Sequence, residues 1–114
     1  MPTTEIALPT VLESTYIVVW EYQVKAECEA EFIQAYGPDG EWARLFRRSP
    51  EFMGVELLGS VGNATRFFTL DHWASAVAME AFLAANATAY DVLDRRFGGL
   101  TVWERRIGGF PPEA

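Results

Sequence analysis

The fold is decided by a stretch near the start of the chain, Tyr16-Ile17-Val18-Val19-Trp20-Glu21-Tyr22-Gln23-Val24. β-Branched and aromatic side chains fill most of these positions, and only Glu21 and Gln23 interrupt them, on one face. The stretch therefore predicts a β-strand. Because both of its faces carry apolar residues, we expect it to lie in the middle of a sheet.

Around this strand the chain repeats one layout twice. Further strand patterns occupy residues 52–60, 65–73 and 100–107, and helical patterns fill the connections at residues 25–51 and 74–99. Two strand–helix–strand units joined by a tight turn, with right-handed crossovers, form a ferredoxin-like α+β fold. We therefore expect one four-stranded antiparallel sheet with the helices on one face.

Three local signals predict where helices begin. Asp39 is a candidate N-cap for the second helix, and Ser75 is one for the third. Thr88, with Asp91 three residues on, resembles a capping box for the fourth helix.

Length and periodicity predict a single domain. The chain has 114 residues, 50% of them apolar, which is enough for one packed core. Residues 1–14 hold two prolines and show no clear periodicity, so we expect an extended N-terminal leader. The domain then spans residues 15–110, and residues 111–114 form a C-terminal tail.

Both faces of the predicted sheet are apolar, although the helices can cover only one of them. On the second strand, Met53, Val55 and Leu57 alternate with Phe52 and Leu58. An uncovered face of this kind would exceed the apolar patch of about 300–600 Å² that a typical monomer exposes. We therefore expect a homodimer in which two sheets pack face to face, which makes a dimeric α/β barrel.

Charge and cysteine content exclude several partners. Nine Lys and Arg against 16 Asp and Glu give a net charge of -7, which repels nucleic acid. The longest apolar runs have only a few residues, so no membrane span is expected. A single cysteine, Cys28, allows no internal disulfide, which favours a cytoplasmic protein.

No nucleotide or metal cofactor is expected. The chain has no GxGxxG or Walker sequence, and one histidine, His72, does not make a plausible metal site. We expect the purified protein to carry no metal, flavin, nicotinamide or stoichiometric haem.

Several motifs resemble the antibiotic biosynthesis monooxygenase family. They are the strand at residues 17–22, the helix start Glu29-Ala30-Glu31-Phe32, the stretch at 40–46, the strand entry Pro50-Glu51-Phe52-Met53-Gly54, and Trp73-Ala74-Ser75. The resemblance covers residues 16–107 and implies a dimeric α/β barrel with a pocket between sheet and helices in each subunit. Family members either oxidise a polycyclic phenolic substrate with O₂ and no cofactor, or bind and degrade haem.

The resemblance to the anthrone-oxidising members is partial. Their Trp at the end of the third strand corresponds to Trp73, and Arg95 or Arg96 could supply their late Arg. Their Asn four residues before the Trp and their Tyr six residues after it are replaced by Thr69 and Met79.

The haem-degrading members match less well. They have an Asn on the first strand, where this chain has Trp20 or Tyr22, and a Trp in the following helix, where it has Phe82. Their axial His has no counterpart after His72, so the resemblance disfavours haem degradation.

His72 and Trp73 are the candidate catalytic residues. His72 is the only histidine and suits a general acid or base, while its alternative role is a surface or interface His at a strand end. Trp73 is either a pocket wall or a core anchor. Strand alternation puts Thr69, Asp71 and Trp73 on one face and His72 on the other, so His72 and Trp73 share a pocket only if the strand end twists.

The candidate substrate-binding residues lie around Trp73 in the pocket that the resemblance implies. They are Trp20, Tyr22, Thr69, Met79, Phe82 and Tyr90. Trp20 and Tyr22 share a strand face and could stack on a flat aromatic ligand, and their alternative role is that of core residues.

Glu21 is a carboxylate in the middle of an apolar strand. If it is buried, it must be paired, and Arg66, Arg105 or Arg106 on the neighbouring strands could pair with it. We expect a structural ion pair rather than a catalytic acid.

Two functions are consistent with these observations. The first is a cofactor-independent monooxygenase that oxidises a small aromatic, phenolic or quinol-like substrate with O₂. A deprotonated phenol or enol can itself pass an electron to O₂ when the pocket is dry and offers donors to the anion. The alternative is a non-catalytic dimeric barrel that binds an apolar metabolite.

Overall fold

The computed structural model describes residues 16–113, and the predicted leader at residues 1–14 lies outside the described residues. Strands β1 to β4 cover Tyr16–Val24, Phe52–Ser60, Asn63–Trp73 and Thr101–Phe110. Helices α1 to α4 cover Glu29–Tyr36, Glu41–Phe46, Ala76–Ala85 and Ala87–Phe97, and the short 3₁₀ turns η2 and η3 cover Ala26–Cys28 and Gly98–Leu100. Pro111–Glu113 follow β4 without regular secondary structure.

The four strands form one sheet in the order β2-β3-β1-β4, and each neighbouring pair is antiparallel. Two strand–helix–strand units joined by the β2–β3 hairpin give this order, so the ferredoxin-like α+β fold is confirmed. The first strand is central, as its two apolar faces predicted, because it pairs with both β3 and β4.

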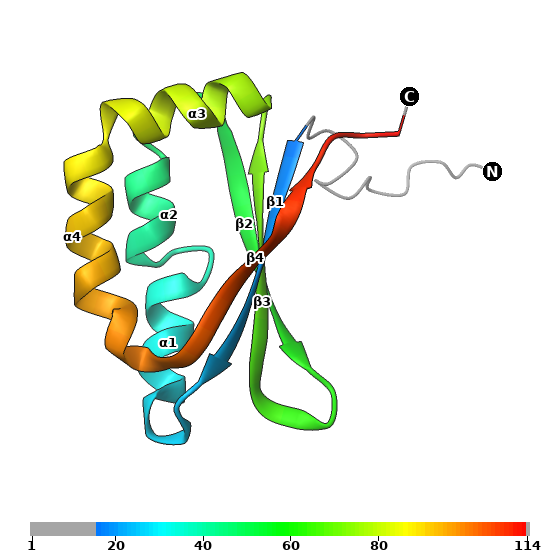
Figure 1. Ribbon diagram of the computed structural model, residues 1–114, viewed down its shortest axis with the longest axis vertical. Coiled ribbons are helices and arrows are strands. Elements are labelled where there is room, and N and C mark those ends of the chain that lie inside the picture. Colours follow the sequence, from blue (N-terminus) through cyan, green and yellow to red (C-terminus); the bar gives the residue numbers. More distant parts are fainter. Residues whose placement is uncertain (1–15, 114) are drawn as a thin grey trace.

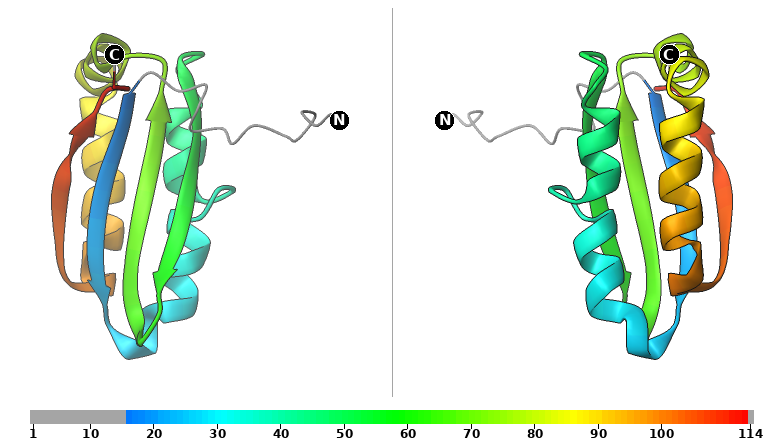
Figure 2. Two further views of the ribbon diagram at one scale, coloured as in Figure 1. Left: turned by 90° about the vertical axis from the view of Figure 1, so that its right-hand side faces the viewer. Right: turned by 90° about the vertical axis from the view of Figure 1, so that its left-hand side faces the viewer.

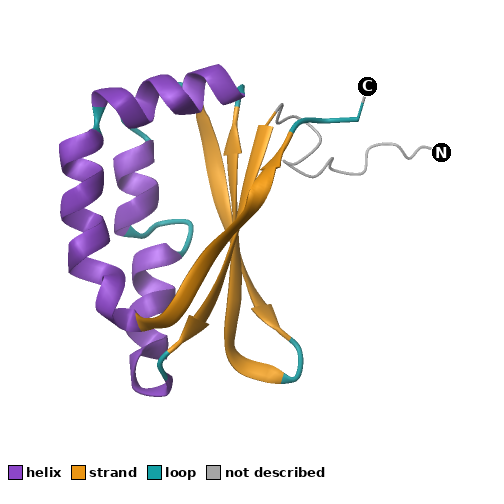
Figure 3. Cartoon of the chain, viewed as in Figure 1, coloured by secondary structure: helices purple, strands orange, loops and turns teal. Residues whose placement is uncertain are grey.

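The helices form a single layer on one face of the sheet (Figure 1). In the left view of Figure 2 the helical layer lies behind the strands, in the right view it lies in front of them, and no described helix covers the opposite face. Coloured by secondary structure, the molecule separates into a helical half and a strand half (Figure 3). Among the described residues, no helix is long and apolar enough to cross a membrane.

The core lies between these two layers and is mainly aromatic. From the sheet, Val18, Tyr22, Val24, Phe67 and Trp73 are buried, and their alternate spacing places them on the helix-covered face. From the helices, the buried residues include Phe32, Tyr36, Trp42, Phe46 and Phe82. Phe32 and Tyr36, one helical turn apart, stack with ring centroids 4.2 Å apart.

The opposite face of β1 holds the buried carboxylate of Glu21, which is 1% exposed. Arg105 donates to Oε1 over 2.8 Å, and Arg66 donates to Oε2. Burial alone would raise the pKa of Glu21, but the hydrogen bonds from Arg105 and Arg66 outweigh it and leave the pKa below its usual value. The predicted ion pair is confirmed, whereas Arg106 instead donates to the Tyr16 hydroxyl.

Two of the three predicted helix starts are wrong. α2 begins after Gly40, and the Asp39 carbonyl, rather than its side chain, accepts a hydrogen bond from Arg44. α4 follows α3 with Asn86 alone between them, so Thr88 falls inside the helix and Asp91 pairs with Arg95. The Ser75 cap is confirmed, since its Oγ accepts from the Ala78 N–H over 3.0 Å.

Gly54 marks a bulge where β2 leaves strict register with β3. Phe52 lies opposite Trp73 and Gly54 opposite His72, so Met53 is the extra residue. Gly54 has φ +124°, a conformation that favours glycine, and a Cβ there would meet no atom within 4 Å. Any cost of a side chain at this position is therefore backbone strain rather than a clash.

We expect Gly54→Ala to lower the free energy of unfolding by about 1–3 kcal/mol because alanine is strained at this φ. Gly59→Ala in the same strand is the control, since its Cβ would make ordinary contact with Phe67 and its φ is not positive. Its effect should stay within about 0.5 kcal/mol. Urea denaturation of both variants measures the difference, and equal stabilities would contradict the strain at Gly54.

Candidate functional site

A cavity of about 360 Å³ lies between the inner face of the sheet and the helical layer. All four strands and three helices, α1, α2 and α4, contribute to its walls. The lining residues are Trp20, Tyr22, Tyr36, Trp42, Ala43, Phe46, Val55, Thr69, Asp71, Tyr90, Asp94 and Glu104. This volume lies within the usual range for a small-molecule site.

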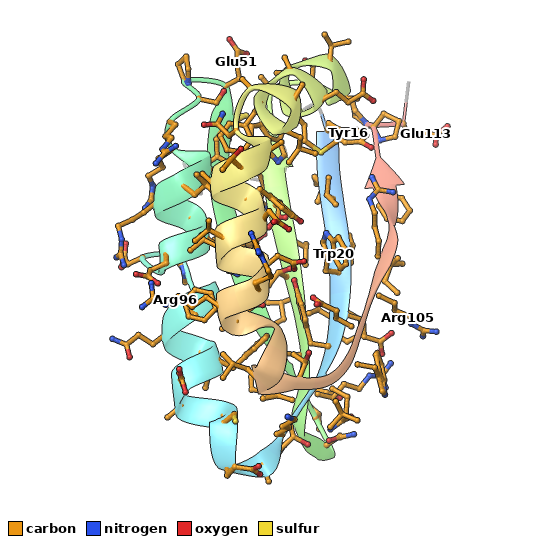
Figure 4. All side chains as sticks on the ribbon, turned by 60° about the vertical axis from the view of Figure 1, so that its left-hand side comes forward. Tyr16, Trp20, Glu51, Arg96, Arg105 and Glu113 are labelled. Carbon is orange, nitrogen blue, oxygen red and sulfur yellow. The ribbon has the colours of Figure 1, made fainter. Side chains whose placement is uncertain are left out.

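Aromatic rings form two of the cavity walls. On β1, Trp20 and Tyr22 are two residues apart and stack with centroids 6.4 Å apart and an interplanar angle of 19°. Across from the sheet, Trp42 of α2 and Tyr90 of α4 meet edge to face at 4.9 Å. Figure 4 labels Trp20 on β1, next to the helical layer. Flat walls of this kind suit a planar aromatic ligand.

The cavity also offers hydrogen-bonding groups from its walls. The Tyr22 hydroxyl and Thr69 Oγ1 lie 3.0 Å apart, and the two residues come from the paired central strands. The indole Nε1 of Trp42 is buried and has no hydrogen-bond partner among the described residues. A ligand oxygen placed beside the Tyr22–Thr69 pair would find a hydroxyl donor there.

Asp71 is the carboxylate on the sheet wall of the cavity. It lies on β3 two residues from Thr69, and no hydrogen bond or ion pair joins its carboxylate to another of the residues 16–113. Its side chain keeps some surface toward the open cavity, and protein atoms surround it on the other sides. Burial raises the pKa of Asp71 to about 7.

The lining carries negative charge without a compensating cation. Asp94 of α4 and Glu104 of β4 are exposed members of the lining, so they mark the mouth of the cavity. Burial, followed by the charge of Asp94, raises the pKa of Glu104. No Lys, Arg or His belongs to the lining among the described residues.

Four of the predicted substrate-binding residues line this cavity: Trp20, Tyr22, Thr69 and Tyr90. The structure places Met79 and Phe82 elsewhere, in the core beneath α3. Their predicted binding roles stay predictions, but only the first four share one cavity.

The structure does not bring the two predicted catalytic residues together. Trp73 is 1% exposed and packs against Phe46, Phe52 and Phe82, with centroids 5.1–5.6 Å away, so it does not line the cavity. His72 lies on the opposite face of the sheet, where its Nε2 is 2.7 Å from Glu56 Oε1. The strand end does not twist enough to unite them, and their catalytic roles stay predictions.

The two arginines that the resemblance offers also lie outside the cavity. Arg95 pairs with Asp91 on the exposed side of α4, and Arg96 pairs with Glu41 of α2. Figure 4 labels Arg96 near the α1–α2 side of the molecule.

Sequence reasoning missed six of the polar and aromatic residues that line the cavity. They are Tyr36, Trp42, Phe46, Asp71, Asp94 and Glu104. For Asp71 a signal was available, since strand alternation put it on the same face as Thr69. A carboxylate on a face that packs against helices must be paired or functional, and the same argument was applied to Glu21. The residues from α1, α2, α4 and β4 depend on how the helices cross the sheet, which periodicity does not give.

The fold is similar to that of several solved α+β oxygenases. The cofactor-independent oxygenase SnoaB from Streptomyces nogalater, as a mutant, has 19% identity and a TM-score of 0.69, over 89% of this chain and 95% of its own. The ActVA-Orf6 monooxygenase from Streptomyces coelicolor, in complex with nanaomycin D, has 14% identity and a TM-score of 0.71, over 90% and 91%. A MhuD mutant with two manganese protoporphyrin IX per active site has 22% identity and a TM-score of 0.66, over 87% and 95%.

Residues 15–89, well over half of the chain, match the family model of antibiotic biosynthesis monooxygenases. The chain belongs to this family, and the resemblance of its motifs is confirmed. No curated protein matches the chain.

The cavity residues do not fit the porphyrin that the MhuD structure holds. The only histidine of the chain, His72, lies on the other face of the sheet, and the described part of the lining has no arginine or lysine to pair with propionates. Asp71, Asp94 and Glu104 would repel these groups. Within residues 16–113, no group of three His, Cys, Asp or Glu is arranged to hold a metal ion.

We expect Asp71→Asn to remove a pH-dependent loss of stability. The pKa of Asp71 is about 7 in the folded protein against 3.8 for an ordinary Asp, so the folded state binds more protons between these values. The contribution of Asp71 to the free energy of unfolding therefore falls as the pH rises from about 4 to 7. Relative to the wild type, the variant should gain about 2–4 kcal/mol between about pH 4 and pH 8.

Urea denaturation across this pH range measures the gain. Asp91→Asn makes the same chemical change on the exposed side of α4 and should show no such gain. If the pH profiles of Asp71→Asn and the wild type are parallel, the pKa of Asp71 is not raised in the folded protein and the prediction is wrong.

Proposed function

We propose that this protein is a cofactor-independent monooxygenase that oxidises a small aromatic, phenolic or quinol-like substrate with O₂ in the cavity described above. The observation that carries the proposal is the composition of the cavity walls. A flat aromatic ligand would lie against Trp20 and Tyr22, and the hydroxyl groups of Tyr22 and Thr69 would offer hydrogen bonds to its oxygen atoms. Membership of the monooxygenase family supports the same proposal.

The chemistry requires that the substrate supply its own electrons. An ionised phenol or enol passes one electron to O₂, and the two radicals then combine to form a carbon–oxygen bond. Protonation of the peroxide and loss of water leave a carbonyl, so an anthrone methylene would become a quinone carbonyl. The protein contributes aromatic walls, a fixed orientation and donors for the developing anion.

The negative lining sets a limit on the substrate. A ligand with a carboxylate would enter against Asp94 and Glu104 and lie beside Asp71, with no lining cation to compensate. We therefore infer that the substrate is uncharged or carries an amine rather than a carboxylate.

The non-catalytic barrel that binds an apolar metabolite is the second candidate function. Thr69 and Met79, which replace the Asn and Tyr of the anthrone-oxidising members, favour it. It would use the same cavity, and turnover separates it from the first proposal.

We also propose that the protein forms a homodimer through the outer face of its sheet and works in the cytoplasm. No described helix covers this face, and Leu58 and Trp103, which lie on it, are 46% and 41% exposed. A second copy of the face is the simplest cover for such a surface. The free thiol of Cys28 fits a reducing compartment.

Oxygen consumption tests the oxidation. We expect the wild type to consume O₂ with a hydroxylated anthrone or a naphthohydroquinone, faster than buffer alone. A carboxylated anthrone should react at least about tenfold more slowly, because the negative charges of the lining repel its carboxylate. Binding of these compounds without O₂ consumption would support the non-catalytic alternative.

Two indole variants in the same assay locate the donor. Trp42→Phe removes the indole N–H of a residue that lines the cavity, and Trp73→Phe removes the indole N–H of a residue that does not line it. A loss of turnover confined to Trp42→Phe supports the cavity as the site. A loss confined to Trp73→Phe supports the role that the family resemblance gives to Trp73.

Light scattering tests the dimer. We expect the wild type to have the mass of two chains and Leu58→Glu to shift it toward one, because the substitution puts a charge on the outer face. Val77→Glu is the matched control, since Val77 is an exposed apolar residue on α3. A wild type that is monomeric at micromolar concentration would refute the proposal.

A further inference from the structure

We propose that Asp71 is the catalytic base that accepts the proton from a hydroxyl group of the substrate. The inference rests on the proposed function and adds the residue that starts the reaction. It also restricts the ligands of the cavity to molecules that can donate a hydrogen bond to a carboxylate.

The geometry places Asp71 where a ligand would lie. The β1–β3 register pairs Val18 with Asp71 and Trp20 with Thr69, so Asp71 lies one cross-strand pair along the same face from the Trp20 ring. On the other side β2 pairs Val55 with Asp71, and Val55 also lines the cavity. A planar ligand on Trp20 and Tyr22 would therefore present its edge to Thr69 and Asp71.

The carboxylate is also free to accept a proton. It makes no hydrogen bond and no ion pair within the described part of the chain, in contrast to Glu21, which two arginines hold on the outer face. Burying an unpaired carboxylate is unfavourable, and a hydroxyl of the ligand would supply the missing donor. Burial raises the pKa of Asp71 to about 7, which is near the optimum for a general base at neutral pH.

The other titratable groups that face Asp71 are less suited to this step. Tyr22 of β1, Tyr36 of α1 and Tyr90 of α4 are phenols whose pKa values burial raises further above 10, so at neutral pH they donate rather than accept. Asp94 of α4 and Glu104 of β4 are exposed at the mouth. From α2 and β2 the lining receives no titratable group.

The substrate, O₂ and Asp71 account for every proton and electron of the reaction, so no further reactant is required. The O–H bond of the substrate breaks, its electron pair stays on the substrate oxygen, and a new O–H bond forms on Asp71. The anion then reduces O₂, the resulting radicals form a carbon–peroxide bond, and Asp71 returns its proton to the peroxide. Loss of water completes the oxidation, and the carboxylate is regenerated.

The first measurement is the pH dependence of O₂ consumption. The wild-type rate should rise with pH through about 7, because the base must be ionised. Asp71→Asn should lower turnover at least about 100-fold and remove this inflection. Asp91→Asn, outside the cavity, should leave both the rate and the inflection unchanged. An unaltered pH profile in Asp71→Asn would overturn the inference while leaving the oxidation itself supported.

The second measurement does not depend on turnover. Binding of para-nitrophenolate at about pH 8 should be accompanied by the uptake of nearly one proton, because a phenolate oxygen beside the ionised carboxylate of Asp71 favours protonation of one of the two. Calorimetry in buffers of different ionisation enthalpy reports this proton. Asp71→Asn should bind the probe with no uptake, whereas Asp91→Asn should behave as the wild type.

The two measurements separate the two proposals. Proton uptake that depends on Asp71, with no O₂ consumption by the wild type, would support the proton acceptor and overturn the monooxygenase. Uptake that persists in Asp71→Asn, or no uptake by the wild type, would overturn the role of Asp71. A wild type that does not bind the probe would also overturn it.

Discussion

The antiparallel pairing of β1 with β3 is the constraint on which the rest of the domain depends. Its register sets Trp20 opposite Thr69 and Val18 opposite Asp71, and strand alternation then assigns every second residue to the helix-covered face. A shift of one residue would send the cavity side chains to the outer face and bring Glu21 inside. The chemistry of the site is therefore set by the register of two strands, before any helix contributes.

The same sheet holds a buried carboxylate, Glu21, and a partly buried one, Asp71, and their pKa values are shifted in opposite directions. Glu21 lies on the outer face between Arg66 and Arg105, and its pKa is lowered. Asp71 lies on the inner face without a partner, and its pKa is raised to about 7. The difference comes from the neighbours, because paired charge stabilises an ionised carboxylate and burial alone does not. Glu21 thus has a structural role, whereas Asp71 is able to accept a proton.

The strands, their faces and the family could be predicted from the sequence. A period of two residues and a turn-rich hairpin are local patterns that neighbouring residues define. It placed the site at Trp73, and the structure instead closes that strand end with Phe46 of α2 and Phe82 of α3. The open space lies further along the strands, where Trp42 of α2 and Tyr90 of α4 form a wall. The placement of helices over a sheet depends on side chains from distant segments, so local sequence patterns do not predict it.

The mouth of the cavity lies between a helix and a strand at the edge of the sheet. β4 is hydrogen-bonded on one side only, and it carries Glu104, while α4 carries Asp94. A small molecule can therefore enter without separating the central strands, and it must pass two carboxylates on the way. These charges act on the rate of association: they slow anions, speed cations, and lose their influence as salt shortens the range of the field. The entrance thus filters ligands kinetically by charge, independently of how tightly the aromatic walls hold them.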